Sequence, residues 1–318
     1  MNSNLIFLAL SLLIISCKNE KDSIKDKIIP SIKPDQYITV LGIAQDGGFP
    51  HINNTDEFVA VKNSEIKKEL VVSLGLIDSK EKKKFLFEAS PDLPEQLSIL
   101  DDEYLKSKSI IDGIFLTHAH IGHYTGLMYF GREAMGAKEI PIYAMPKMKT
   151  FLETNGPWSQ LVALRNIIIH PIKEDSVLSI TKSLRVISFK VPHRDEYSET
   201  VGYKIIGNHK SALFIPDINK WSLWEKNIVE QVKQVDYAFI DATFFKNGEI
   251  PRPMEEVPHP FIEETTNLFK NESEEIKSKV IFIHFNHSNP ALDVDNEDRI
   301  LLEEQGYRFA TTRDIFPL

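Results

Sequence analysis

The order of predicted strands and helices indicates an α/β protein, an αββα four-layer sandwich in which two sheets pack together and helices cover their outer faces. Strands come in pairs in the first part of the chain and alternate with helices later, and no linker interrupts residues 37–318. The chain has 318 residues, of which 42% are hydrophobic, which is enough to bury a large core. We therefore expect one domain over residues 37–318.

Short apolar runs bounded by turn residues predict the strands. They lie at residues 37–41, 71–77, 84–88, 110–117, 141–145, 167–170, 184–190, 200–206, 212–215, 237–240, 280–285 and 308–311. The second and third runs are expected to form a hairpin. Helices are predicted after Asp92, where Pro94 suits a first turn, and in later segments with apolar residues at helical spacing. These segments are residues 124–135, 148–154, 228–232, 261–269 and a last helix from about residue 295.

The first residues form a separate segment. Residues 5–15 are apolar but too short to span a bilayer, which takes about 20 residues. They end in Ile14-Ile15-Ser16-Cys17, which resembles a bacterial lipobox, although residues 1–4 lack the usual basic residue. We expect a signal peptide over residues 1–16, lipidation of Cys17 and a polar tether over residues 17–36. The alternative is a short apolar helix with a chance cysteine.

A lipid anchor at Cys17 would hold the protein on a membrane of the bacterial cell envelope, facing the periplasm or the cell surface. Cys17 is the only cysteine, so no disulfide can form within the chain. The net charge of -9 disfavours nonspecific binding to nucleic acid, which depends on Lys and Arg. The glycine-rich loop at residues 42–50 lacks the spacing and the lysine of a phosphate-binding loop. No segment indicates an oligomeric state.

Three histidines, His118, His120 and His123, lie within six residues directly after the apolar strand at residues 110–117. Residues two apart in extended backbone share a face, so His118 and His120 can point the same way. His123 can join them if the chain turns into a helix at that point. Imidazole is a frequent ligand of zinc and also suits iron. The pattern therefore indicates a metal site rather than three unrelated surface histidines.

Four more candidate residues lie at the ends of predicted strands: His193, Asp217, Asp241 and His284. Strand ends at one edge of two packed sheets converge, so these distant residues can meet there. A catalytic metal site needs three or four nitrogen or oxygen donors and one open position for water. Asp92 and Asp112 are expected to orient ligands or cap helices rather than to bind metal.

The motif His118-Ala-His120-Ile-Gly122-His123 resembles the HxHxDH signature of the metallo-β-lactamase superfamily. Within it the chain is most similar to pyrroloquinoline quinone biosynthesis protein B and its relatives. The blocks that carry this resemblance are residues 40–50, 88–93, 241–244 and 283–292. The resemblance extends to the phosphodiesterase branch, which has an extra histidine where this chain has His259.

The resemblance implies two metal positions. His118, His120 and His193 would hold the first metal, Asp217 would bridge, and His123 and His284 would hold the second. The family's aspartate is Gly122 here, so we expect one tightly held zinc and a second bound weakly, with iron or manganese as other candidate metals. If two metals bind tightly, Asp241 or His287 would supply the missing donor.

Three functions remain open. The leading interpretation is a metal-dependent hydrolase that attacks a small-molecule ester or phosphodiester with metal-bound water. His259 or His287 would protonate the leaving group, and Asp217 would contact the metal or its water. The second is an iron-dependent hydroxylase, as the quinone-biosynthesis resemblance implies. The third is a noncatalytic lipoprotein that binds a ligand on the same scaffold, with Gly122 marking lost activity.

Overall fold

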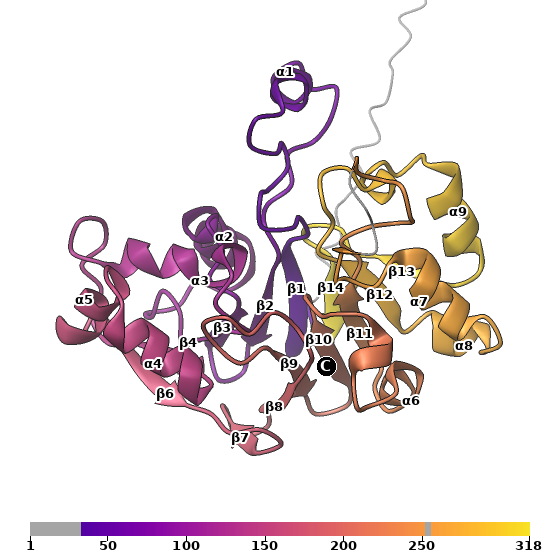
Figure 1. Ribbon diagram of the computed structural model, residues 1–318. Coiled ribbons are helices and arrows are strands. Elements are labelled where there is room, and N and C mark those ends of the chain that lie inside the picture. Colours follow the sequence, from indigo (N-terminus) through magenta and orange to yellow (C-terminus); the bar gives the residue numbers. More distant parts are fainter. Residues whose placement is uncertain (1–32, 252–255) are drawn as a thin grey trace, which may run out of the picture. The chain divides into compact units, whose positions relative to one another are not determined.

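Two seven-stranded sheets pack against each other in the computed structural model, which describes residues 33–251 and 256–318 (Figure 1). Their facing sides share one core, in which Phe87 and Phe115 of the first sheet contact Tyr203 of the second. Figure 1 shows α2–α5 beside the first sheet and α6–α8 beside the second. The predicted α/β sandwich is therefore confirmed.

The first sheet has the strand order β14-β1-β2-β3-β4-β5-β6. Its strands are β1 (Gln36–Gly42), β2 (Ser73–Asp78), β3 (Lys83–Phe87), β4 (Gly113–Phe115), β5 (Ile140–Ala144), β6 (Ile167–Pro171) and β14 (Ile315–Pro317). The expected hairpin of β2 and β3 is present, and the pairs from β3 to β6 are parallel. Because β1 and β3 are both antiparallel to β2, their ends lie at the same edge as the end of β4.

The second sheet has the order β13-β12-β11-β10-β9-β8-β7. Its strands are β7 (Val177–Ser179), β8 (Arg185–Lys190), β9 (Val201–Ile206), β10 (Ser211–Ile215), β11 (Tyr237–Asp241), β12 (Val280–Ile283) and β13 (Arg308–Phe309). Strands β10 to β13 are parallel, and β8 shares their direction because both β8 and β10 are antiparallel to β9. The carboxyl ends of β8, β10, β11 and β12 therefore lie at one edge.

The helices fall largely where the apolar spacing predicts them. They are α1 (Thr55–Lys62), α2 (Leu93–Ile99), α3 (Ile121–Tyr124), α4 (Pro146–Thr154), α5 (Trp158–Ala163), α6 (Ile228–Lys233), α7 (Ile262–Phe269), α8 (Glu274–Lys277) and α9 (Glu297–Glu304). A π-helical turn, η1 (Leu100–Tyr104), extends α2, and short 3₁₀ turns are η2 (Thr125–Phe130), η3 (Trp221–Leu223) and η5 (Pro290–Leu292). In the described part of the chain, no helix has the length and apolar character needed to cross a membrane.

The helix expected at residues 124–135 is wrong. The chain forms the single turn α3 and then the 3₁₀ helix η2, which ends before Gly131. Gly126 packs so closely on the backbone that an added Cβ would lie 2.0 Å from the carbonyl oxygen of Ser90. This close approach fixes η2 against the segment before α2, and sequence periodicity does not report it. Helices α1, α5 and α8 and strands β7 and β14 were not predicted either.

The aromatic residue Phe115, at the end of β4, lies in the middle of the core between the sheets. It is fully buried, with ring centroids 4.9 Å from Phe87, 4.5 Å from Tyr143 and 5.6 Å from Tyr203. The histidine motif begins three residues later, at His118. Packing of Phe115 therefore fixes the point from which the histidines project.

We expect Phe115→Ala to lower the free energy of unfolding by about 3–5 kcal/mol, because it removes a buried ring and leaves a cavity. Denaturant unfolding followed by circular dichroism measures the change. Phe58→Ala is the matched control, since Phe58 is 54% exposed on α1; it should change the stability by less than about 0.5 kcal/mol. Equal effects of the two substitutions would contradict this view of the core.

Candidate metal centre

The histidine motif follows β4 and reaches its site through a change from extended to helical backbone. His120 has φ -97° and ψ 151° and immediately precedes α3, which carries His123. The side chains of His118 and His123 are buried, whereas that of His120 is 13% exposed. The predicted turn into a helix after two histidines is therefore present, and all three imidazoles lie together.

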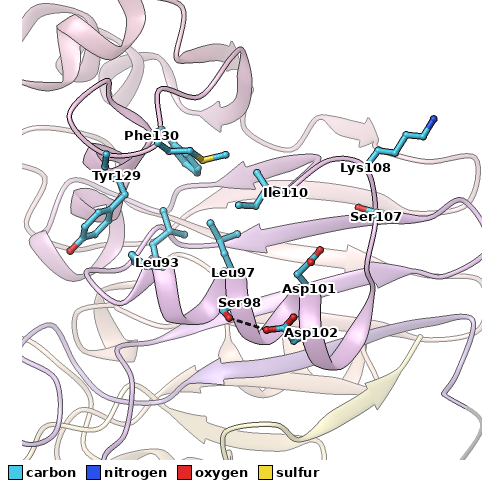
Figure 2. A pocket seen from close by; sticks show the side chains of 13 residues that line it. Leu93, Leu97, Ser98, Asp101, Asp102, Ser107, Lys108, Ile110, Tyr129 and Phe130 are labelled. Carbon is cyan, nitrogen blue, oxygen red and sulfur yellow. Dashed lines mark hydrogen bonds between the residues drawn. The ribbon is translucent and has the colours of Figure 1, made fainter.

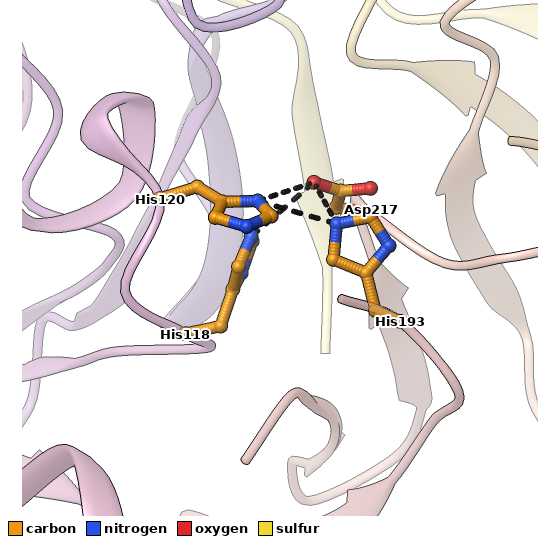
Figure 3. A group of neighbouring side chains, drawn as sticks. All are labelled: His118, His120, His193 and Asp217. Atoms are coloured by element: carbon orange, nitrogen blue, oxygen red, sulfur yellow. Dashed lines mark hydrogen bonds and ion pairs between the residues drawn. The ribbon is translucent and has the colours of Figure 1, made fainter. Parts of the chain in front are cut away.

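A first cluster joins His118, His120 and His193 around Asp217, which follows β10 (Figure 3). The Asp217 Oδ2 atom lies 3.3 Å from His118 Nε2, 3.7 Å from His120 Nδ1 and 3.1 Å from His193 Nε2. His120 Nδ1 and His193 Nε2 are 3.2 Å apart. These four residues are the ones that the sequence grouped around the first metal.

The other ring nitrogen of each histidine in this cluster lies next to a side-chain oxygen. These contacts are His118 Nδ1 to Thr117 Oγ1 at 2.9 Å, His120 Nε2 to Glu196 Oε2 at 3.3 Å, and His193 Nδ1 to Asn219 Oδ1 at 3.1 Å. Partners of this kind fix the orientation of a metal-binding imidazole and its tautomer. The arrangement leaves one nitrogen of each ring directed into the cluster.

A second cluster consists of His123, His284 and Asp46. Asp46 Oδ1 lies 3.2 Å from His123 Nε2 and 4.0 Å from His284 Nε2, and Asp217 Oδ2 lies 3.8 Å from His123 Nε2. Asp217 thus faces both clusters, as expected for a bridging residue. The remaining ring nitrogens of this pair contact Glu88 Oε1, at 3.3 Å from His123 Nδ1, and Thr243 Oγ1, at 2.9 Å from His284 Nδ1.

Asp46 was not among the predicted ligands. The expectation that Gly122 leaves the second cluster without a carboxylate is wrong, because the Asp46 carboxylate lies beside Gly122. His287, one of the two residues expected to supply a missing donor, lies outside the cluster, whereas the fully buried His284 lies in it as predicted.

Asp241 and His259 form a buried pair next to Asp217. His259 Nδ1 lies 2.8 Å from Asp241 Oδ2 and 3.2 Å from Asp217 Oδ1. Both oxygens of Asp241 already accept hydrogen bonds from the protein, with Oδ1 accepting from Thr243 and Oδ2 from the Ile218 backbone N–H. Asp241 is therefore placed to orient His259 and the loops around Asp217.

The site concentrates negative charge in the interior. Four carboxylates of the site form ion pairs with histidines: Asp46, Glu88, Asp217 and Asp241. Among the described residues, no lysine or arginine forms a salt bridge with any of them. Burial disfavours the ionised form of Asp46 and Asp217, but the surrounding imidazoles outweigh it and hold both pKa values well below the usual range. The same balance lowers the pKa of Asp241 to about 2.

The histidines respond to this charge in two ways. Burial lowers the pKa of His284, but the neighbouring carboxylates of Asp241 and Asp46 outweigh it and raise the pKa to about 9. The carboxylates of Glu88 and Asp46 likewise raise the pKa of His123 well above its usual value. Burial and the nearby His123 hold the pKa of His118 well below the usual range. The second cluster therefore attracts positive charge, which protons or a metal ion can supply.

The donor atoms fit a metal ion. His118 Nε2, His123 Nε2, His284 Nε2, Asp46 Oδ1 and Asp217 Oδ1 are buried without a hydrogen-bond partner. Burying unpaired polar atoms is unfavourable unless another group satisfies them. Imidazole nitrogens and carboxylate oxygens in sets of three and four are the ligands that zinc and iron prefer. These atoms are therefore suited to hold a metal.

His287 lies outside both clusters. Its Nδ1 atom lies 2.7 Å from Glu57 Oε1, and its ring stacks on His51 with centroids 4.1 Å apart. Asp92 accepts a hydrogen bond from the Val71 backbone N–H. Asp112 accepts from Lys83 and from the Lys84 backbone. The two aspartates stabilise the first sheet and do not face the metal centre.

A cavity of about 740 Å³ lies between α2, η1 and η2, and its lining includes Leu93, Leu97, Ile110, Tyr129 and Phe130 (Figure 2). None of the candidate ligands lines it. This cavity is therefore separate from the candidate metal centre, which is formed by the histidines and carboxylates.

Two acidic residues of the site were missed by the sequence reasoning, the partly buried Asp46 and the fully buried Glu88. Both come after strands that run in the same direction as β4, Asp46 after β1 and Glu88 after β3. The strand-end rule that found the histidines would have pointed to both. Glu88 also has φ 82°, a left-handed conformation that is uncommon outside glycine and asparagine.

Comparisons with known proteins agree with this geometry. The model of the β-lactamase superfamily domain matches residues 83–285. The coenzyme PQQ synthesis protein B of Acinetobacter baylyi is 24% identical over 292 residues, covering 84% of this chain and 95% of that protein. One similar solved structure is Zn²⁺-bound PqqB from Methylobacterium extorquens, with a TM-score of 0.72 and 18% identity; the match covers 89% of this chain and 100% of that chain. Another is a diphosphatase from the PhnP family, with a TM-score of 0.60 and 22% identity; the match covers 88% of this chain and 96% of that chain.

The matched region contains His118, His120, His123, His193, Asp217 and His284. The ligand clusters support a metal cofactor. The similarity to PqqB extends over most of both chains. This chain therefore belongs to the β-lactamase superfamily, in a branch that resembles PqqB.

Proposed function

We propose that the protein is a metal-dependent hydrolase of a small-molecule ester, with a phosphodiester as the favoured substrate class. The observation that supports it most is the first cluster, in which one nitrogen of each of three oriented imidazoles lies 3.1–3.7 Å from Asp217 Oδ2. His120 is partly exposed, so this point is accessible from solvent on one side.

Zinc held by His118, His120, His193 and Asp217 would lower the pKa of a bound water toward 7 and so supply a nucleophile at neutral pH. The protein's part is to fix the ligands. Asn219 and Glu196 orient His193 and His120, so the imidazoles need little rearrangement to bind the ion.

His259 is the better of the two proposed proton donors. Its Nδ1 atom is held by Asp241, and the described residues give its Nε2 atom no hydrogen-bond partner. The ring can therefore present Nε2–H to a leaving-group oxygen while Asp241 stabilises the protonated imidazole. His287 is bound to Glu57 and stacked on His51, away from both metal clusters.

The preference for a phosphodiester rests on two observations. The PhnP-family neighbour, whose fold covers most of this chain, is a diphosphatase, so a protein of this fold acts on a bond at phosphorus. Two adjacent ligand clusters that share Asp217 suit a pair of metals acting on both oxygens of a displacement at phosphorus.

A second candidate is an oxygen-dependent hydroxylase related to PqqB, favoured by the similarity over 95% of the Acinetobacter protein. Three histidines and one carboxylate accommodate iron as well as zinc. The third candidate, a noncatalytic ligand-binding protein, has less support. The main argument for a noncatalytic protein was the absence of the motif's carboxylate at Gly122, but the Asp46 carboxylate lies beside Gly122 in the structure.

We also propose that the chain is lipid-anchored through Cys17. Residues 1–16 and Cys17 lie outside the described residues, so this proposal rests on the sequence Ile14-Ile15-Ser16-Cys17. The anchor would place the metal centre in the cell envelope.

Removing the first cluster should remove a bound metal. We expect His120→Ala to lower the zinc content of the purified protein, measured by inductively coupled plasma mass spectrometry, and chelation to lower the melting temperature of the unmodified protein. A bound ligand at a hundredfold excess over its Kd stabilises the native state by about 2.7 kcal/mol. The control is His209→Ala, an exposed histidine outside the clusters. Unchanged zinc in His120→Ala would refute the assignment.

The metal-loaded protein should hydrolyse bis(p-nitrophenyl) phosphate. We expect His259→Asn to reduce kcat by roughly 10²–10⁴-fold, because it removes the proton donor, with zinc content unchanged. Release of p-nitrophenol measures the rate, and His209→Ala again serves as the control. No hydrolysis with zinc, manganese or iron, together with oxygen uptake by the iron-loaded protein, would favour the hydroxylase instead.

Acylation at Cys17 can be tested by fractionation. We expect Cys17→Ser to leave the membrane fraction or to remain an unprocessed precursor, because a serine cannot carry the thioether-linked lipid. Mass spectrometry of the unmodified protein should show the lipid mass on Cys17. A Cys17→Ser protein that is processed to the same mass and stays with membranes would rule the anchor out.

A further inference from the structure

We propose that Asp46 is the carboxylate ligand of a second metal, replacing the aspartate that the family motif carries at the position of Gly122. The inference deepens the proposed function, which uses the same site, but it concerns metal binding and can be tested without activity. It rests on the contacts of Asp46, on the space beside Gly122 and on the attachment of the loop that carries Asp46.

The contacts define a site of three protein donors with Asp217 at its border. Asp46 Oδ1 lies 3.2 Å from His123 Nε2 and 4.0 Å from His284 Nε2. Each of these atoms is buried and has no hydrogen-bond partner, and both imidazoles are fully buried. Unpartnered atoms that converge in this way leave room for a cation that would contact all of them.

Gly122 provides the space that Asp46 occupies. A Cβ at position 122 would lie 2.1 Å from Asp46 Oδ1 and 2.8 Å from Asp46 Cα. A side chain at position 122 and the Asp46 carboxylate therefore exclude each other. The glycine in the motif is explained by the carboxylate that arrives from another loop, and it does not indicate a lost site.

The loop that carries Asp46 is fixed to the strand end that carries His284. The Gln45 N–H donates to the Phe285 carbonyl at 2.8 Å, and the Phe285 N–H donates to the Ile43 carbonyl at 2.8 Å. The two residues that flank Ala44 are therefore hydrogen-bonded to Phe285, which is next to His284, and Asp46 follows them directly. This attachment positions the carboxylate before any metal binds.

The charges also fit a second divalent ion. Asp46, Glu88, Asp217 and Asp241 bring four negative charges, which two divalent cations would balance. An anionic donor strengthens a site more than a neutral one because it offsets the charge of the ion. The other candidate donors are committed, Asp241 to Thr243, Ile218 and His259, and His287 to Glu57.

The test is zinc titration of the full-length chain in detergent after its metal has been removed. We expect two tightly bound zinc ions per unmodified chain by mass spectrometry and isothermal calorimetry. Asp46→Asn keeps the shape of the side chain but loses its charge, so it should retain one zinc and weaken the second by at least about tenfold. Asp295→Asn, the same change at an exposed aspartate outside the clusters, should retain both.

Gly122→Asp tests the exclusion of the two side chains. Restoring the motif should not raise the zinc content above that of the unmodified chain, because the new Cβ displaces Asp46. Two tight zinc ions in Asp46→Asn, only one in the unmodified chain, or a gain of zinc in Gly122→Asp would each overturn the inference. Two zinc ions without phosphodiester hydrolysis would instead reject the proposed function and leave this inference standing.

Discussion

The need to balance buried negative charge governs this site. Four carboxylates lie among six histidines at one edge of the sandwich, without a described lysine or arginine salt bridge to any of them. Isolated buried charges are very unfavourable, so the fold must supply protons or cations there. The carboxylates raise the pKa values of His123 and His284, so that protonated imidazoles can supply part of this positive charge, and divalent ions would supply it more effectively.

Strand direction is what gathers the charged residues. Within the first sheet, β1, β3 and β4 run in the same direction. Within the second sheet, β8, β10, β11 and β12 also run in the same direction as one another. The residues of the site lie at or after the carboxyl ends of these strands: Asp46, Glu88, His118, His193, Asp217, Asp241 and His284. The buried aromatic core around Phe115 fixes the two sheets, and thereby the distances between loops that are far apart in sequence.

The sequence predicted most strands, the sandwich and the histidine clusters, because apolar runs and the residues that follow them are local signals. The strand-end rule was not applied to Asp46, which lies just past β1, and the hydrogen bonds between residues 43–45 and Phe285 that bring it to His284 form only in the folded chain. The sequence reasoning misjudged residues 124–135 because the close packing of Gly126 on Ser90 overrides helical spacing. The occupation of the space beside Gly122 by Asp46 likewise depends on packing, so the motif comparison alone interpreted the glycine as a lost metal ligand.

The most direct measurement is a crystal structure of the zinc-loaded protein with anomalous diffraction recorded on both sides of the zinc absorption edge. The account predicts two zinc peaks. One should lie among His118, His120, His193 and Asp217, and the other among Asp46, His123 and His284, with Asp217 between them. A single peak with Asp46 turned away from His123, or zinc bound only outside these clusters, would contradict it.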